Sequence, residues 1–529
     1  MKRLIWAPAL LCASLAATAH AQTSADASRE HVKANAESAL TEPFKPTAAT
    51  TEGTVTIGGH AIAYQAVAGT LVVHPRGWDD VAKTPTAVAS MFYVAYFKKG
   101  GGQRPITFFY NGGPGYSTML LHMAGFGPRR VVTPDHEHTP PAPYTLVNNG
   151  SSLLDATDEV FIDAPGTGFS RIAGKDKAKA FYGVDADGYA FAAFITQFLS
   201  KYNRWNSPKY LAGESYGTIR SAVVINDLEA HRGVDFNGVI LMSDIMNWNL
   251  FLDSASLNPG VDLPYALALP SYAATAWYHH KLPGNPPNFD ALISDVERFA
   301  MGDYLRALEA GNDLSEADRA AIAQKLHEYT GLPVAYILKG NLRIDGGEFR
   351  HTLLGDEDMS IGRLDTRYSG PQGDPLGQRA GVLNDPTFTS LDSALISELN
   401  TYMHEVLHYG EGETYKPSIE VGWNFRHREP GEFFARPWMG TNVMPDLANA
   451  MRRNPDLKVM LNSGYFDVAC PFYEQTYEMK HLPIPAQLQS NIEYHYYRSG
   501  HMIYAREKSL VRLHANVAAF IRRTSREGD

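Results

Sequence analysis

Strand-like apolar runs that end in turns, several of them rich in glycine, recur through this sequence and constrain its fold more than any other feature. Segments with helical periodicity, such as YGTIRSAVVINDLEAHR after residue 215, lie between them. Strands that alternate with helices form a mainly parallel sheet, and ligands bind at the carboxyl ends of its strands. The sequence therefore predicts an α/β fold. The runs are PITFFYNGGPG (105–115), DEVFIDAPGTGFS (158–170), PKYLAGES (208–215), NGVILMSDIMNW (237–248), LKVMLNSGYFD (457–467) and IEYHYYRSGH (492–501).

The remaining regions differ in pattern from this sheet. From Thr54 the short runs TVTIG, AIAYQAVAG, GTLVVH and ASMFYVAYFKK predict antiparallel hairpins. Helical segments and Pro-rich connectors dominate residues 249–390, which we interpret as a helical cap inserted into a sheet domain of residues 51–248 and 391–529. Residues 22–50 are rich in Ala, Thr, Ser and Glu and are expected to form a flexible leader.

The first 21 residues have the pattern of a secretory signal. A basic start precedes an apolar stretch, and the small-residue pattern at 19–21 predicts cleavage before Gln22. Of the two cysteines, Cys12 would leave with the signal and Cys470 would remain alone, so the mature chain would hold no internal disulfide. These features predict a periplasmic or secreted protein.

Charge and hydropathy exclude two classes of partner. The net charge is −10, and acidic and basic residues are mixed along the chain without a basic arm or stripe. This pattern argues against a nucleic acid partner. After the signal, no run is long and apolar enough to predict a membrane span.

Residues 213–217, Gly-Glu-Ser-Tyr-Gly, fit Gly-x-Ser-x-Gly at a predicted strand-to-helix turn. Such a turn projects the serine hydroxyl above the sheet. A serine nucleophile needs an adjacent base, and the base needs an orienting acid. Asp467 and His501 each follow a late predicted strand, in the order Ser, Asp, His that is typical of sheet hydrolases. Asp467 and His501 are therefore predicted to form a catalytic triad with Ser215.

The segment Asn111-Gly112-Gly113-Pro114-Gly115 forms a second glycine-rich turn. Glycines let a backbone approach a ligand closely and direct its N–H groups at a developing oxyanion. A plain Gly/Pro turn is the alternative interpretation of the same residues.

The motifs NGGPG, GESYG, SGYFD and SGHM, in this order, resemble the serine carboxypeptidase family from about Thr54 to Phe520. The resemblance implies an α/β-hydrolase fold, no cofactor, and peptide substrates with a free C-terminal carboxylate. It also implies residue roles. These are Ser215 as nucleophile, His501 as general base and then acid, Asp467 as orienting carboxylate, the N–H groups of Gly113 and Tyr216 as oxyanion hole, and Asn111, Gly112, Glu214 and Met502 as substrate-binding residues.

Glu214 stands beside the predicted nucleophile. A charged Glu214 would repel a substrate carboxylate, whereas a shared proton turns the repulsion into a hydrogen bond. Binding would then favour acidic pH, while His501 must be neutral to act as a base. A buried acid bonded to the backbone is the alternative interpretation of Glu214. The family usually has a second Glu where this chain has Gly125, so an esterase or acyltransferase with the same triad stays open. A binding protein with a hydrolase fold and no turnover is a further alternative, and the complete set of predicted triad residues argues against it.

His404-Glu405-Val406-Leu407-His408 fits the zinc-peptidase pattern His-Glu-x-x-His. The surrounding segment predicts an amphipathic helix that turns both histidines toward the solvated side. A zinc metallopeptidase acting through His404, Glu405 and His408 is therefore the less favoured hypothesis. The predicted apolar stripe is Leu395, Leu399, Tyr402, Met403, Val406 and Leu407.

Overall fold

The computed structural model describes residues 43–77, 87–380, 385–432 and 440–525. The predicted signal peptide and most of the predicted leader lie outside these residues. The end of that leader does not: β1 begins at Ala48, so residues 48–50 are strand rather than leader. The reason is that the neighbouring strand is long enough to pair with them, with Ala48 opposite Gly69.

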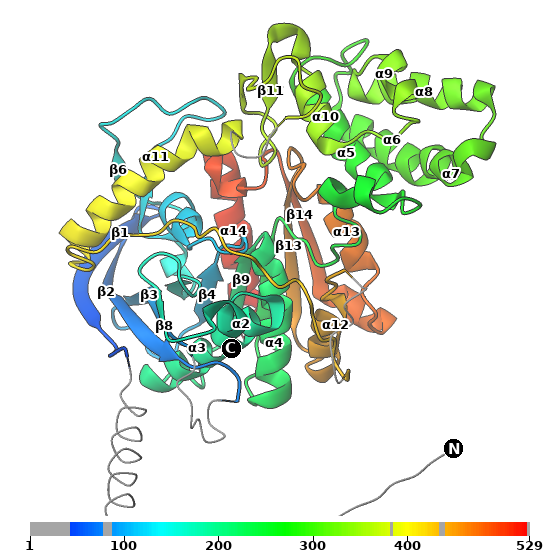
Figure 1. The fold of residues 1–529 in the computed structure, drawn as a ribbon. Coiled ribbons are helices and arrows are strands. Elements are labelled where there is room, and N and C mark those ends of the chain that lie inside the picture. Colours follow the sequence, from blue (N-terminus) through cyan, green and yellow to red (C-terminus); the bar gives the residue numbers. More distant parts are fainter. Residues whose placement is uncertain (1–42, 78–86, 381–384, 433–439, 526–529) are drawn as a thin grey trace, which may run out of the picture.

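One large mixed sheet forms the centre of the molecule (Figure 1). Within the described residues its strands run in the order β1-β2-β3-β7-β4-β9-β10-β13-β14, and β8 pairs with β3 beside this path. Every pair from β7 to β14 is parallel, whereas β1, β2, β3 and β7 pair antiparallel. The strands are β1 (Ala48–Ile57), β2 (His60–Val73), β3 (Val88–Lys98), β4 (Ile106–Tyr110), β7 (Asp158–Ile162), β8 (Arg171–Ala173), β9 (Lys209–Glu214), β10 (Gly238–Met242), β13 (Lys458–Gly464) and β14 (Ile492–Tyr497). Both the parallel sheet and the antiparallel hairpins are confirmed.

Helices cover both faces of the parallel strands. Along β9, Gly213 faces α4, because a Cβ there would overlap the Gly217 carbonyl of that helix. Tyr210, on the opposite face, donates its hydroxyl to the Ile521 carbonyl of α14. The alternation of side chains along a strand thus assigns α4 and α14 to opposite sides. The helices of the sheet domain are α2 (Lys177–Phe181), α3 (Val184–Lys201), α4 (Tyr216–His231), α11 (Pro386–Thr401), α12 (Met444–Arg453), α13 (Phe472–Lys480) and α14 (Glu507–Thr524).

A helical cap projects from one end of the sheet domain, at the upper right of Figure 1. Its apolar cluster takes members from Leu252 to Ile361 and includes Val468 of the sheet domain. In α6, Asn288 caps the N-terminus and an apolar stripe is buried, which is why this short segment is helical. The cap elements are α5 (Leu263–Tyr278), α6 (Phe289–Phe299), α7 (Leu305–Ala310), α8 (Glu316–Thr330), α9 (Val334–Lys339), α10 (Gly346–Thr352) and the hairpin of β11 (Met359–Ile361) and β12 (Ser369–Pro371).

The boundary after the cap differs from the prediction. Helix α11 begins at Pro386, before the predicted boundary at residue 391, and its buried Leu391 and Leu395 pack in the main core. A second small hairpin, β5 (Arg129–Val131) with β6 (Leu146–Asn148), lies outside the large sheet.

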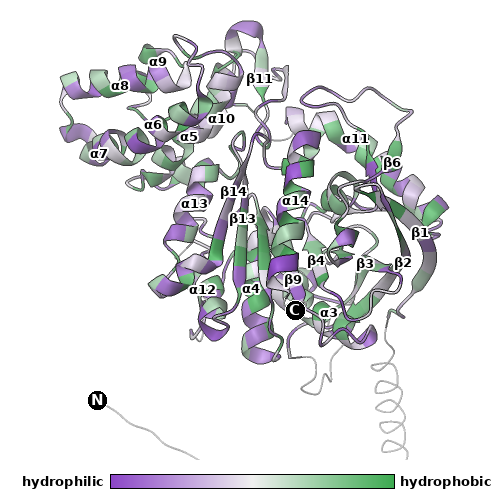
Figure 2. Ribbon diagram, turned by 180° about the vertical axis from the view of Figure 1, so that it is seen from behind, coloured by the Kyte–Doolittle hydropathy of each residue, from purple (hydrophilic) through white to green (hydrophobic). Residues whose placement is uncertain are grey.

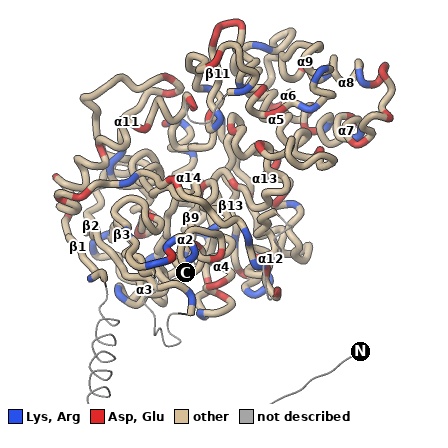
Figure 3. Tube along the Cα trace, in the orientation of Figure 1, with Lys and Arg blue, Asp and Glu red and all other residues tan. Residues whose placement is uncertain are grey.

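The surface carries no single dominant charge. Figure 3 shows Lys and Arg interspersed with Asp and Glu along the cap helices, and Figure 2 shows hydrophilic and hydrophobic residues alternating there. Such alternation is typical of helices with one buried and one solvated face. Across the described ranges we find no helix of the length and apolar character that a membrane crossing requires.

A buried ion pair fastens the helices to the end of β4. Arg220 of α4 and Asp187 of α3 are 1% and 0% exposed, and their Nε and Oδ2 atoms lie 2.7 Å apart. The same guanidinium donates to the Asn111 carbonyl at 2.6 Å and lies over the Phe191 ring. Arg220 therefore links two helices and the glycine-rich turn that follows β4.

We predict that Arg220→Met lowers the free energy of unfolding by about 3–5 kcal/mol, because it leaves the Asp187 carboxylate buried without its partner. The double variant Arg220→Met with Asp187→Leu should lose less. Arg298→Met, which removes an exposed pair with Asp295, should cost about 0.5 kcal/mol or less. Chemical denaturation measures the free energy of unfolding of all three variants. Equal losses in Arg220→Met and Arg298→Met would contradict the linking role of Arg220.

Candidate active site

Ser215 occupies a tight turn between β9 and α4. Its backbone lies at φ 60° and ψ −131°, a conformation that a non-glycine residue adopts only when its surroundings enforce it. A Cβ at Gly213 would overlap the Gly217 carbonyl, and a Cβ at Gly217 would lie 2.9 Å from the Tyr110 carbonyl. Both glycines of the motif are thus required by close packing, and the turn places Ser215 at the carboxyl edge of the sheet.

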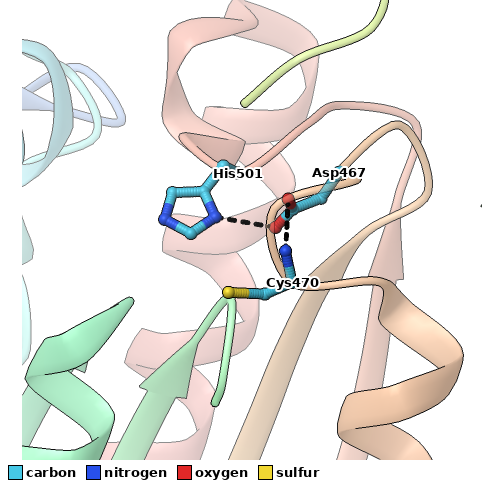
Figure 4. A group of neighbouring side chains, drawn as sticks. All are labelled: Asp467, Cys470 and His501. Carbon is cyan, nitrogen blue, oxygen red and sulfur yellow. Dashed lines mark hydrogen bonds and ion pairs between the residues drawn. The ribbon is translucent and has the colours of Figure 1, made fainter. Parts of the chain in front are cut away.

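Asp467 and His501 meet at the same edge. Asp467 follows the end of β13 by three residues, and His501 follows the end of β14 by four. The His501 Nδ1 and Asp467 Oδ2 atoms lie 2.8 Å apart (Figure 4). Asp467 Oδ1 accepts the backbone N–H groups of Ala469 and Cys470 at 2.8 and 2.9 Å, so its carboxylate is held in place. A proton on Nδ1 leaves Nε2 as the basic nitrogen.

The surroundings of His501 favour its charged form. Burial lowers the pKa of His501, but the charge of Asp467, the hydrogen bond to it and the charge of Glu214 together raise the pKa above its ordinary value. Arg363 opposes this shift with its positive charge. His501 therefore binds a proton more readily than a free imidazole does.

Cys470 packs beside Asp467 and His501 as an unreactive side chain. It is buried beside Asp467, and one donor atom each of Asp467, Cys470 and His501 lies within 4.8 Å of the others. Burial, followed by the charge of Asp467, raises the pKa of the Cys470 thiol well above its ordinary value. The thiol stays protonated and packs as a small apolar side chain.

The glycine-rich turn lies directly over the start of α4. A Cβ at Gly112 would overlap the backbone nitrogen of Tyr216, so the two backbones touch. Gly113 has φ 103°, a conformation that favours glycine, and it is exposed. The first N–H groups of a helix have no partner within the helix. The turn and Tyr216 therefore bring backbone N–H groups to the same edge as Ser215.

The predicted substrate-binding residues lie close together. Asn111 Nδ2 donates to Glu214 Oε1 at 3.0 Å and lies 3.4 Å from the Tyr504 hydroxyl. Burial raises the pKa of Glu214 to about 7, against the lowering effects of the His501 charge and of hydrogen bonds from Tyr504 and Asn111. Met502, next to His501, is 1% exposed. The alternative of Glu214 bonded only to backbone is not what the structure shows.

A strap of residues 415–427 crosses the outside of the glycine-rich turn. The Ile419 N–H donates to the Gly115 carbonyl at 2.9 Å. Trp423 Nε1 donates to the Tyr216 hydroxyl at 3.1 Å, and the two rings meet edge to face. The strap thus fastens the turn and the start of α4 from outside. It has no regular periodicity, so sequence analysis missed it.

The far end of the strap is held by His427. Its ring nitrogens lie 2.6 Å from Asp185 and 2.7 Å from Asp446. Burial lowers the pKa of His427, but these two carboxylates outweigh it and raise the pKa to about 10. The imidazolium is therefore charged at neutral pH and ties the strap to α3 and α12.

A segment of residues 363–366 joins the loops that carry Asp467 and His501. The Arg363 carbonyl accepts the Val468 N–H at 3.3 Å, and the Leu364 carbonyl accepts the His501 N–H at 2.6 Å. One short segment thus sets the spacing of the two loops. It lies in the predicted cap and carries no motif, which is why sequence analysis passed over it.

Asp365 adds a side-chain contact to this segment. Its Oδ2 accepts the Gly500 N–H at 3.1 Å, and Arg367 Nη2 lies 2.6 Å from the same oxygen. Both charged side chains are 1% exposed. The pair holds the residue directly before His501.

The His-Glu-x-x-His motif takes a different form from the predicted helix. Helix α11 passes into a short π-helix, Tyr402–Val406, and His408 lies beyond it at φ 51°. His404 Nε2 contacts the Gly410 carbonyl at 3.1 Å and His408 Nδ1 the His404 carbonyl at 3.3 Å. The rings are exposed, as predicted, but they do not stand one turn apart on an α-helix.

The position of Val406 was predicted wrongly. It belongs to the predicted apolar stripe, yet it is 42% exposed, whereas Tyr402, Met403 and Leu407 are buried. A π-turn holds more residues than an α-turn, so it rotates the following side chains away from the stripe.

Comparisons with known proteins agree with this geometry. Residues 76–245, which contain the glycine-rich turn and the serine turn, match the family described as Serine carboxypeptidase. Over 142 residues the chain is 32% identical to the pheromone-processing carboxypeptidase KEX1 of Yarrowia lipolytica. That match covers 26% of this chain and 21% of the relative, about a fifth of the relative's length.

A solved structure extends the likeness over most of the chain. The KEX1 prohormone-processing carboxypeptidase of Saccharomyces cerevisiae superposes with a TM-score of 0.51 at 16% identity, covering 87% of this chain and 91% of that one. At this identity the likeness shows the fold. The α/β-hydrolase fold predicted from the sequence is confirmed.

We predict that Gly500→Ala slows the reaction of the serine with a fluorophosphonate probe by about 100-fold, because a Cβ there would overlap Asp365 and the Leu364 carbonyl and displace His501. Gly302→Ala, where a Cβ would meet nothing within 4 Å, is the matched control and should leave labelling unchanged. Equal labelling by both variants would show that the segment does not position His501.

Proposed function

We propose, from the relationship of this chain to the serine carboxypeptidases, that it releases C-terminal residues from peptides through an acyl-enzyme. The observation that carries the proposal is the 2.8 Å contact between His501 and Asp467 at the sheet edge that also holds Ser215. The Asn111–Glu214 pair beside it supports the choice of substrate, because it offers hydrogen bonds to a carboxylate.

In the proposed mechanism His501 Nε2 takes the proton of Ser215 Oγ as that oxygen attacks the scissile carbonyl. The N–H groups of Gly113 and Tyr216 bind the oxyanion. Asp467 stabilises the imidazolium, which then gives its proton to the leaving amine as the peptide C–N bond breaks. Water, deprotonated by His501, hydrolyses the ester, and the proton returns to Ser215.

Carboxylate recognition sets the pH range in this proposal. Below its pKa of about 7, Glu214 is protonated and donates to the substrate carboxylate; above it, the two carboxylates repel. Asn111 and the backbone of Gly112 complete the site, and Met502 lines the side of the leaving residue. Location in the periplasm, or secretion, remains a prediction from the first 21 residues.

We predict a bell-shaped pH dependence of kcat/KM for a blocked dipeptide with a free carboxylate. The acid limb follows His501, whose neutral form is the base, and the alkaline limb follows ionisation of Glu214 near pH 7. Glu214→Gln should remove the alkaline limb. An ester substrate without a carboxylate is the control, since wild type should show no alkaline limb with it. Persistence of that limb in Glu214→Gln would refute the shared proton.

Ser215→Ala should lower turnover by about 10⁴-fold or more, because the nucleophile is lost while the fold remains. A chelator should leave wild type unaffected, and the opposite pattern would favour a zinc peptidase. The free-acid dipeptide and its amide separate the two serine hypotheses. Preference for the acid supports a carboxypeptidase, whereas hydrolysis of simple esters alone supports the esterase or acyltransferase that Gly125 left open.

A further inference from the structure

Tyr504 brings a third polar group to Asn111 and Glu214. It lies in the short 3-10 helix Ile503–Ala505, three residues after His501, and is 2% exposed. Its hydroxyl lies 3.4 Å from Asn111 Nδ2 and also interacts with the Glu214 carboxyl group. Three segments at one sheet edge therefore contribute an amide, a carboxyl group and a phenol to one buried cluster.

The hydrogen bonds within this group are incomplete. Glu214 is 2% exposed, yet its Oε2 accepts no hydrogen bond from any residue that the structure describes. The single Asn111 Nδ2 is shared between Glu214 at 3.0 Å and Tyr504 at a long 3.4 Å. Buried polar atoms without partners are costly, and their presence beside Ser215 indicates a ligand that supplies the missing partners. When Glu214 is protonated, its carboxyl O–H and the Tyr504 hydroxyl are donors, and a carboxylate has two oxygens that accept from them.

Gly125 makes room for the Tyr504 ring. A Cβ at this position would lie 3.6 Å from Tyr504 Cγ and 3.7 Å from Cδ1, which is ordinary van der Waals contact, so alanine would fit at 125 and would touch the ring. A longer side chain at 125 would occupy the space of the ring. The small residue at 125 and the large residue at 504 therefore complement each other.

We propose that Tyr504 binds the C-terminal carboxylate of the substrate, donating its hydroxyl alongside Asn111 and Glu214. The inference rests on the proposed carboxypeptidase function. It explains how a chain with glycine at 125 retains three side-chain groups for the carboxylate, the third being a phenol attached to another loop.

A phenol differs from a carboxyl group in its pH dependence. Burial and the Glu214 charge raise the pKa of Tyr504 well above its ordinary value, so the hydroxyl keeps its proton throughout the range in which His501 works as a base. The groups that face it are Glu214 and Asn111. Loss of the Tyr504 hydroxyl should therefore weaken binding throughout this range. It should also move the alkaline limb to higher pH, because the Tyr504 hydrogen bond lowers the pKa of Glu214, whereas loss of Glu214 should remove that limb.

The test is Tyr504→Phe, which removes the hydroxyl and keeps the ring. We expect KM for a blocked dipeptide acid to rise about 10- to 100-fold at every pH from 5 to 8, with hydrolysis of an N-blocked amino acid ester unchanged. Tyr304→Phe is the matched control, because its buried hydroxyl bonds the Leu342 carbonyl in the cap. Gly125→Leu, which displaces the ring, should reproduce the loss if Tyr504→Phe does not fold.

A second measurement separates this inference from the proposed function. The dipeptide acid and its amide are compared as inhibitors of ester hydrolysis. If wild type prefers the acid and Tyr504→Phe loses that preference, Tyr504 binds the carboxylate. If the variant keeps the preference, Tyr504 has no such role and the carboxypeptidase stands. If wild type itself shows no preference, the proposed function fails and the role of Tyr504 fails with it.

Discussion

The parallel pairing of β9, β10, β13 and β14 is the constraint on which the candidate site depends. Each strand ends at the same edge, with Met242 opposite both Glu214 and Asn462. The strands thereby bring residues more than 250 positions apart in the chain to one edge of the sheet. Short loops after β13 and β14 place Asp467 and His501 there. The segment at 363–366 and the strap at 415–427 then hold those loops, so the scaffold is secured from the cap side and from outside.

Glu214 is coupled to His501 through charge. Its negative charge raises the pKa of His501, and the positive charge of His501 lowers the pKa of Glu214. Protonation of one residue therefore favours loss of the proton from the other. In the proposed mechanism, a substrate carboxylate that binds the protonated Glu214 removes a charge that favours the imidazolium. Binding would thus help His501 to act as the base.

Much of the fold could be predicted from the sequence because its signals are local. The runs before Ser215 and Asp467 have the composition of buried strands, and the glycines at 213 and 217 mark the tight turn. The errors in the prediction also have identifiable causes. Strand β1 begins earlier than its apolar pattern because pairing with β2 extends it, and Val406 left the apolar stripe because a π-turn interrupts the helix.

By itself, the sequence determined the alternation of strands and helices and the order of Ser215, Asp467 and His501 on strand ends. These follow from periodicity and spacing, which the chain carries locally. Only the tertiary structure decided that Tyr504 rests on Gly125 and reaches Asn111, and that Leu364 accepts the His501 N–H. Those contacts join segments far apart in the chain, and no local pattern encodes which distant backbone will fill a given space.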